Sequence, residues 1–427
     1  MDAKIRNQFI GLATVSAALV AIAYIRSKSQ NDQKVKKQEE EGNEREDLGR
    51  NSSWANNDLT DNSAPVPLMP HEHEKRMSQR MQKFQSEVID EVSQERNKVT
   101  VRVPATSANL GPGYDCLGMA VDMWSEVTVE RADKFSMEFE GDGAADLPIN
   151  EENLLCVGVK AAFQAAGKQV PPLKYTCKSR IPYARGLGSS SAAIVGGLIA
   201  GLVLAGHQLP CWGKEALLNM ASEIEGHPDN VAPALYGGIQ IGIHSGERWT
   251  SERVPCPPGL QAVLFIPNTV GITKEVRGVL KDEVPRKDAT FNIGRVAWLI
   301  NALATGNIDN IKFGVQDALH QPQRGKHCFP HMQPLIEAAV NAGANGAYLS
   351  GAGPTIMAIT SGVSGDMFTQ RFNERVDSEV GDAMLAAAKK CGVQGQVYIT
   401  RIIENGAQVT YAEPNFSRDV LRYHGDV

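Results

Sequence analysis

The sequence predicts an α+β fold in two halves, and three observations support this prediction. Segments typical of strands and helices mix along the chain without the regular βαβ repeat of a parallel α/β fold. A proline cluster at residues 254–259 separates two such mixed regions, and the first hundred residues differ in composition from all that follows. We therefore expect four segments, at residues 1–28, 29–96, 97–255 and 256–427.

Length and composition fit a folded protein of two or three domains. The chain has 427 residues, of which 42% are hydrophobic and 22% charged, and about 150 residues per domain is usual. The formal net charge of −6 gives a general nucleic-acid-binding role no electrostatic support. The seven cysteines are scattered without a Cys-x-x-Cys pair, so we expect neither a disulfide framework nor a zinc site.

The first hundred residues begin with an apolar run, Phe9 to Ile25, that has basic residues on both sides. Its 17 residues reach the lower limit for crossing a bilayer, so we expect a signal anchor that tethers the chain to a membrane. A cleaved signal and an organelle-targeting segment stay open, and the folded body is expected in the cytoplasm or an organelle stroma. Residues 30–70 predict a disordered linker, and residues 72–95 a short amphipathic helix.

Apolar patterning predicts the elements of the first half. Alternating or β-branched residues favour strands, and longer helix-forming runs favour helices. A glycine marks the end of the first helix. The predicted strands are Lys98–Val103, Trp124–Arg131, Lys174–Ile181 and Gly238–His244. The predicted helices are Asn153–Gly167, Ser190–Leu204 and Lys214–Ile224.

The same criteria predict a second mixed region after the proline cluster, and no internal repeat is visible. The predicted strands are Gln261–Ile266, Ala347–Ser350, Ile356–Thr360 and Val397–Glu404. The predicted helices are Thr290–Thr305, Ile308–Leu319, Met332–Ala342 and Thr369–Cys391.

A loop rich in glycine and serine lies between a predicted strand and the long apolar helix. Glycines let successive backbone N–H groups point into one concavity, and the helix N-terminus adds a partial positive charge, so the loop can bind phosphate. A plain turn with a helix cap is the alternative. The loop is not a Walker A motif, because no Gly-Lys-Ser/Thr follows. It consists of Pro182, Tyr183, Ala184, Arg185, Gly186, Leu187, Gly188, Ser189, Ser190, Ser191 and Ala192.

Two further glycine-rich loops follow or join predicted strands. Residues 104–115 offer an amide at Asn109 and a carboxylate at Asp115, which could equally make local turn hydrogen bonds. Residues 349–355 would by themselves be read as a β-turn.

Together, the three loops resemble the motifs of the GHMP kinase superfamily, and within it those of the homoserine kinase family. Pro-x-Thr-x-Ala-Asn-x-Gly-x-Gly-x-Asp is matched at 104–115, Gly-Leu-Gly-Ser-Ser-Ser-Ala at 186–192 and Ser-Gly-Ala-Gly-Pro-Thr at 350–355. A fourth block, residues 225–234, is also similar. The resemblance extends from about Lys98 to the C-terminus.

This resemblance implies a fold and an activity. The fold would be the two-domain GHMP kinase fold, with an N-terminal domain like ribosomal protein S5 domain 2 and a ferredoxin-like C-terminal domain. The activity would be ATP-dependent phosphorylation of the side-chain hydroxyl of L-homoserine, in threonine biosynthesis. Residues 182–192 would then bind ATP.

The resemblance also implies the residues of a substrate site. Asn109 and Asp115 would hold the substrate, and the Asp115 carboxylate suits its ammonium group. His227 would line the same pocket. Asp229 and Asn230 would lie near the reacting hydroxyl. No lysine accompanies Asp229, so we expect only a modest catalytic contribution from it, because phosphoryl transfer depends mainly on positioning and charge neutralisation.

Two arginines and a metal complete the implied site. Arg277 and Arg324, placed by short local motifs, would clamp the substrate carboxylate. A lone arginine is otherwise more often a solvated surface charge. Mg²⁺ prefers oxygen ligands, and we expect Ser190 and Glu225 to supply them. Glu223 is the alternative metal ligand, because the segment between Glu225 and His227 is shorter than the corresponding segment in many members of the family.

Two other functions stay open. One is another GHMP small-molecule kinase, such as one acting on mevalonate, which has no ammonium for Asp115 to bind. The other is a membrane-tethered sensor that keeps the fold without catalysis. GHMP kinases are often dimers, so the resemblance also implies a homodimer.

Overall fold

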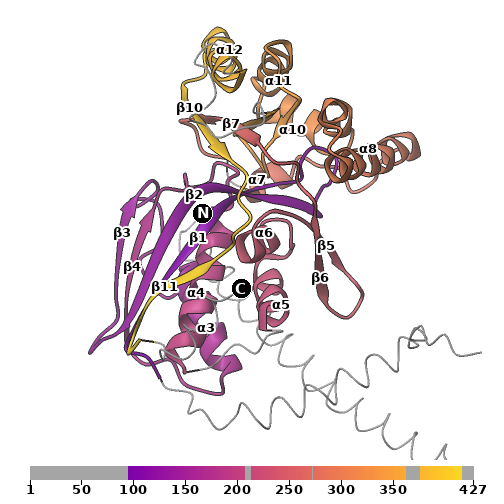
Figure 1. Cartoon of the computed structure of the whole chain (residues 1–427). Coiled ribbons are helices and arrows are strands. Elements are labelled where there is room, and N and C mark those ends of the chain that lie inside the picture. The colour runs from indigo at the N-terminus through magenta and orange to yellow at the C-terminus, as the bar shows by residue number, and fades with distance from the viewer. Residues whose placement is uncertain (1–94, 207–212, 272, 362–375, 416–427) are drawn as a thin grey trace, which may run out of the picture. The chain divides into compact units, whose positions relative to one another are not determined.

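The computed structural model describes residues 95–206, 213–271, 273–361 and 376–415 (Figure 1). All of these fall within Val88–Val427, which clusters as one unit. The apolar run at residues 9–25, the linker and the helix predicted to start at residue 72 lie outside the described residues. Among the residues that are described, no helix is long and apolar enough to cross a membrane.

The first sheet contains seven of the described strands. Their order is β11-β1-β2-β4-β3, and β5 pairs with β2 and with β6. The pairs are antiparallel except for β3 with β4. The strands are β1 (Lys98–Ala108), β2 (Leu117–Arg131), β3 (Ser136–Gly141), β4 (Leu173–Ser179), β5 (Ile239–His244), β6 (Trp249–Val254) and β11 (Gln408–Glu413).

Helix α4 (Ser189–Leu204) forms the centre of the core beneath this sheet. Every side chain from Ile194 to Leu204 is buried, as expected for a helix that is hydrophobic on all sides. It packs against β1 and β2, and against α3 (Leu154–Ala165), α5 (Gly213–Glu225) and α6 (Val231–Tyr236). A helix that is enclosed along most of its length therefore follows directly after the glycine-rich loop.

The second sheet has four of the described strands, in the order β10-β7-β9-β8. Helices α11 and α12 pack on it (Figure 1). The strands are β7 (Leu260–Pro267), β8 (Gly346–Leu349), β9 (Ile356–Ser361) and β10 (Gly395–Arg401). The helices of this region are α7 (Thr273–Arg277), α8 (Arg286–Thr305), the 3₁₀ turn η1 (Ile308–Asn310), α9 (Ile311–Gly314), α10 (Gln321–His327), α11 (Met332–Asn341) and α12 (Val376–Lys390).

The chain returns to the first sheet near its C-terminal end. Strand β11 pairs antiparallel with β1 from Lys98 opposite Glu413 to Arg102 opposite Gln408. The first sheet is thus completed by residues that follow the second sheet in the sequence.

The predicted mixed α+β fold in two domains is confirmed. The helix predicted at 308–319 is wrong beyond Gly314, because the Asp317 carboxylate accepts the backbone N–H groups of His320 and Gln321 and so starts α10 instead. Strands β3, β6 and β11 were not predicted, because they are short and largely polar. Residues 369–375 of the last predicted helix lie outside the described residues.

Candidate active site

The three glycine-rich loops and the 225–230 segment meet in one cleft, which we call the active-site cleft. It is also lined by Thr273 and Arg277 of α7 and by Arg324 of α10. The predicted site residues that line it are Asn109, Asp115, Ser190, Glu225, His227, Asp229, Asn230, Arg277 and Arg324. Positions that span more than two hundred residues of sequence therefore face one space.

The phosphate side of the cleft is formed by the start of α4. Gly188 precedes the helix in the left-handed region, at φ +70°. A Cβ atom there would lie 1.9 Å from Thr106 Oγ1, so only glycine lets β1 and the loop approach this closely. Ser189 and Ser190 line the cleft in the first turn, where backbone N–H groups have no intrahelical partner. This arrangement suits an anion.

The third loop supports the phosphate loop from behind. Ser350 Oγ donates to the Gly186 carbonyl over 2.6 Å. The backbone N–H of Gly351 donates to Ala108, at the end of β1, over 3.1 Å. The three loops are therefore held together by direct hydrogen bonds.

Ser190 and Glu225 form an oxygen-rich pair at the edge of the phosphate loop. Ser190 Oγ donates to Glu225 Oε1 over 2.6 Å. Glu223 does not line the cleft, and its Oε1 accepts from Trp249 Nε1 over 3.1 Å.

Asp229 is 2% exposed and lies at the centre of a small polar network. Its Oδ1 contacts His227 Nδ1 and accepts from Asn230 Nδ2, while Asn230 Oδ1 accepts from Thr106 Oγ1 over 2.8 Å. Burial opposes the charged form of His227, but the hydrogen bond and the negative charge of Asp229 outweigh it and raise the pKa of His227.

Asp115 and Arg277 form a bidentate ion pair, with N–O distances of 3.0 and 2.6 Å. Both side chains are about one third exposed, at 32% and 36%. Burial opposes the charge of Arg277, but the Asp115 hydrogen bond prevails and raises the pKa of Arg277. Asn109 fixes the loop, since its Oδ1 accepts from the backbone of Asp115 and its Nδ2 donates to the Gly351 carbonyl.

Carboxylate and imidazole atoms cluster at this end of the cleft. The ligand atoms of Asp115, His227 and Asp229 lie within 4.8 Å of one another. Such a cluster can receive a cation, either a metal ion or an ammonium group.

Arg324 is only 1% exposed, although it carries a guanidinium group. Its Nη1 donates to the Gly351 carbonyl over 3.0 Å and to His320 Nδ1 over 3.1 Å. Its Nε has no hydrogen-bond partner within the described part of the chain. Burial lowers the pKa of Arg324. A buried cation with an unused donor is a candidate for binding an anion.

Tyr114 and His320 join the two arginines. The guanidinium carbons of Arg277 and Arg324 lie 5.6 and 5.5 Å from the centroid of the Tyr114 ring. His320 Nε2 donates to the Gly111 carbonyl over 2.6 Å, which leaves Nδ1 free to accept from Arg324. Burial lowers the pKa of His320, which favours this neutral form.

Not every residue of the predicted ATP loop faces the cleft. Ala184, Gly186, Gly188, Ser189 and Ser190 line it. The side chains of Leu187 and Ala192 are buried in the core, and Ser191 is also buried.

Arg185 is held away from the cleft by a different set of partners. Its Nε donates to the Pro267 carbonyl, its Nη2 donates to the Asn268 carbonyl, and it pairs with Asp142. Arg185 thus links the loop to the end of β7.

Sequence reasoning did not single out Thr106, Tyr114 or His320. Thr106 and Tyr114 lie inside the predicted 104–115 motif, so their position was available but their role was not. His320 is four residues before Arg324, a spacing at which side chains of a helix meet, and this spacing was the available signal.

Two family models match the chain. The GHMP kinases N terminal domain matches residues 153–238, and the GHMP kinases C terminal domain matches residues 299–377. The first range contains the phosphate loop, α4 and the 225–230 segment.

Curated relatives and solved structures agree. Homoserine kinases of Desulfitobacterium hafniense and Moorella thermoacetica are 39% and 40% identical, covering 73% and 72% of this chain and 99% of each relative. The crystal structure of homoserine kinase from Cytophaga hutchinsonii has a TM-score of 0.64 and 27% identity, covering 74% of this chain and 98% of that one. Streptococcus pneumoniae phosphomevalonate kinase, with phosphomevalonate and AMPPNP, shares the fold at a TM-score of 0.54 and 15% identity, covering 71% of this chain and 100% of that one.

The fold and the glycine-rich loops are thus those of a GHMP kinase. Within this superfamily, the chain belongs to the homoserine kinase family. The resemblance drawn from the sequence motifs is confirmed.

Proposed function

We propose that this chain transfers the γ-phosphoryl group of ATP to the side-chain hydroxyl of L-homoserine, forming O-phospho-L-homoserine for threonine biosynthesis. One observation carries the proposal. A carboxylate and two guanidinium groups, matched to a zwitterion, line the same cleft as a backbone anion site. Membership of the homoserine kinase family supports the same reaction.

On substrate binding, the ion pair between Asp115 and Arg277 would be replaced by two ion pairs, one between each residue and the substrate. Asp115 and Arg277 are paired and partly exposed, so a zwitterion can insert between them. Its ammonium would bind Asp115 near His227, and its carboxylate would bind the guanidinium groups of Arg277 and Arg324, which both line the cleft. Asn109 keeps Asp115 in position through its backbone.

The nucleotide phosphates would lie against residues 182–192. The N-terminus of α4 and the hydroxyl groups of Ser189 and Ser190 support this placement. The donors here belong mainly to the backbone, so they are already oriented before ATP binds, which lowers the cost of stabilising charge in the transition state.

The residues present fit the Mg²⁺ that the family implies. Ser190 Oγ and Glu225 Oε1 lie 2.6 Å apart at the edge of the phosphate loop, and both are oxygens of the kind Mg²⁺ prefers. We assign the metal to these two residues rather than to Glu223, which is hydrogen-bonded to Trp249. The ion would neutralise charge on the ATP phosphates.

Asp229 and Asn230 would orient the reacting hydroxyl. Both line the cleft, and Thr106 and His227 hold their side chains. The hydroxyl proton can leave late, to a phosphate oxygen, so Asp229 acts mainly by positioning and by its charge.

The finer organisation is also proposed. Residues 97–255 would form an S5-domain-2-like ATP-binding domain and residues 256–427 a ferredoxin-like domain. A membrane tether through residues 9–25, a homodimer, and a body located in the cytoplasm or an organelle stroma stay predictions.

The test compares ATP turnover with L-homoserine and with mevalonate on the full chain. Turnover with L-homoserine alone is expected, because mevalonate has no ammonium for Asp115. A preference for mevalonate would favour the other kinase class. The absence of turnover with either, in a folded preparation, would favour the non-catalytic sensor.

A further inference from the structure

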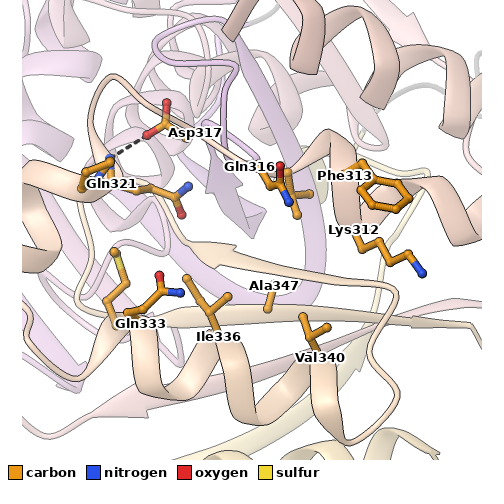
Figure 2. A pocket seen from close by; sticks show the side chains of 12 residues that line it. Lys312, Phe313, Gln316, Asp317, Gln321, Gln333, Ile336, Val340 and Ala347 are labelled. Carbon is orange, nitrogen blue, oxygen red and sulfur yellow. Dashed lines mark hydrogen bonds between the residues drawn. The ribbon is translucent and has the colours of Figure 1, made fainter. Parts of the chain in front are cut away.

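A second cavity, of about 400 Å³, lies between α9, α10, α11 and β8 (Figure 2). It shares no lining residue with the active-site cleft. Its volume falls within the range of small-molecule sites in proteins. We call it the α11 cavity.

One side of the α11 cavity is apolar. Figure 2 shows Ile336 and Val340 projecting from α11 near Ala347 of β8, with Phe313 at one end. These side chains suit a branched aliphatic group rather than a sugar or a nucleotide.

The opposite side carries the side-chain amide of Gln321. Gln321 is 6% exposed, and its Oε1 accepts from the backbone N–H of Leu349 over 2.8 Å. Within the described residues, no group accepts a hydrogen bond from its Nε2, and Figure 2 shows the amide turned toward the interior of the cavity. An amide N–H that opens into a cavity can donate a hydrogen bond to a ligand, and a carboxylate oxygen can accept it.

The charges of the cavity favour an anion. Lys312 is exposed at one end and forms no ion pair with any described carboxylate. The side chain of Asp317, the acidic lining residue, is fully buried. Its oxygens already accept from Asn292, from His320 and from other backbone groups. The lining therefore has no unused carboxylate for an ammonium group.

We propose that the α11 cavity binds a small aliphatic carboxylate that lacks an ammonium group, and that its occupancy lowers the KM for homoserine. The apolar chain packs on Ile336 and Val340. The carboxylate accepts from the Gln321 amide, and the positive charge of Lys312, at the other end of the cavity, favours it only by longer-range attraction.

Two walls of the cavity are connected to Arg324 of the substrate clamp through one intermediate segment each. Asp317 holds the first turn of α10, which carries Arg324. Gln321 holds Leu349, two residues before Gly351, whose carbonyl accepts from Arg324. A ligand that fixes these walls fixes the orientation of Arg324. By reciprocity, homoserine then strengthens binding of the ligand.

The experiment uses the full chain and 4-methylpentanoate as the probe. We expect saturable one-to-one binding by calorimetry that persists in saturating homoserine, and a KM for homoserine about fivefold lower. Leucine, which has the same branched chain with an ammonium group, and 4-methylpentan-1-ol, which lacks the charge, should bind more weakly.

Variants locate the site. Ile336→Trp fills the cavity and should abolish binding, whereas Asn341→Trp, at an exposed position of the same helix, should not. If Ile336→Trp fails to fold, the Lys312→Gln variant tests the location of the site instead. Lys312→Gln should weaken binding of the probe and should leave kcat, measured without the probe, unchanged.

Three results would overturn the proposal. The first is no binding of 4-methylpentanoate, and the second is binding that homoserine displaces. The third is binding that is unaffected by both Ile336→Trp and Lys312→Gln. The KM effect rests on the proposed function, but the calorimetric measurements do not. A chain without kinase activity would therefore leave the binding test intact.

Discussion

The two sides of the active-site cleft are built in different ways. The phosphate side comes from one continuous segment, residues 182–192, and relies on backbone N–H groups at the start of α4. The substrate side relies on charged side chains from distant segments, such as Asp115 and Arg277, which are 162 residues apart. Backbone geometry is therefore encoded locally, whereas the charge clamp exists only once the two sheets have come together.

The largest expected effect tests the phosphate side. Glu225→Gln removes the charge that we assign to the metal, so kcat should fall by about 10²-fold or more, and extra Mg²⁺ should restore part of it. Steady-state kinetics over a Mg²⁺ titration measures this. Glu223→Gln, two residues away and outside the cleft, is the matched control and should stay close to the parent. Equal losses of kcat in the two variants would contradict the assignment of Glu225 as a metal ligand.

On the substrate side, Arg277→Lys keeps the charge but loses the planar fork. The KM for homoserine should rise by about 10- to 100-fold, in line with the loss of charged hydrogen bonds. The KM for ATP should change little, because this residue does not line the phosphate loop. Arg248→Lys, an exposed residue paired with Glu215, serves as control. A fall in kcat with unchanged KM would contradict the clamp.

Asp229→Asn should have a smaller effect, with kcat reduced by less than about tenfold. Phosphoryl transfer depends chiefly on positioning and charge neutralisation, and asparagine retains the size and one acceptor oxygen. A loss as large as that of Glu225→Gln would instead identify Asp229 as a true general base.

The smallest effects distinguish two histidines whose pKa values shift in opposite directions. The pKa of His227 is raised above 6.5, so its stabilising contribution is complete below about pH 6.5 and is lost as pH rises through the raised value. The pKa of His320 is lowered, so its contribution is present above about pH 6.5 and is lost as pH falls.

Denaturant unfolding at several pH values tests this contrast. The stability difference between the parent and His227→Gln should shrink toward high pH, and that between the parent and His320→Gln should shrink toward low pH. Parallel pH dependence in the two variants would contradict the assigned contacts.

The same contrast explains what the sequence could predict. Gly188, Ser190 and Asp115 lie in contiguous motifs with a recognisable order, so their roles were accessible from the resemblance. Tyr114 and His320 acquire a role only when α10 meets the first loop. The spacing of His320 and Arg324 indicates that these two side chains can meet, but no local pattern encodes their contact with the first loop. The residues of the phosphate loop that turn away, such as Arg185, were indistinguishable from their neighbours for the same reason.

The fold shows a similar limit. Helix α4 was predicted almost to the residue, because a long apolar run bounded by a glycine leaves few alternatives. Strand β11 was not predicted, because most of its side chains are exposed and its place is set by pairing with β1. Helix α9 ends before the predicted position, because the Asp317 carboxylate accepts hydrogen bonds from the backbone N–H groups of His320 and Gln321 at the start of α10.

Strand β11 also has a consequence for synthesis of the chain. A growing polypeptide emerges from the ribosome N-terminus first, so β1 appears roughly three hundred residues before its partner Gln408–Glu413. Throughout that interval, one edge of β1 keeps its N–H and C=O groups unpaired, which is a template for aggregation. A nascent chain arrested before residue 408 should therefore be more prone to association than the released protein, and a chaperone that shields strand edges would act in that window.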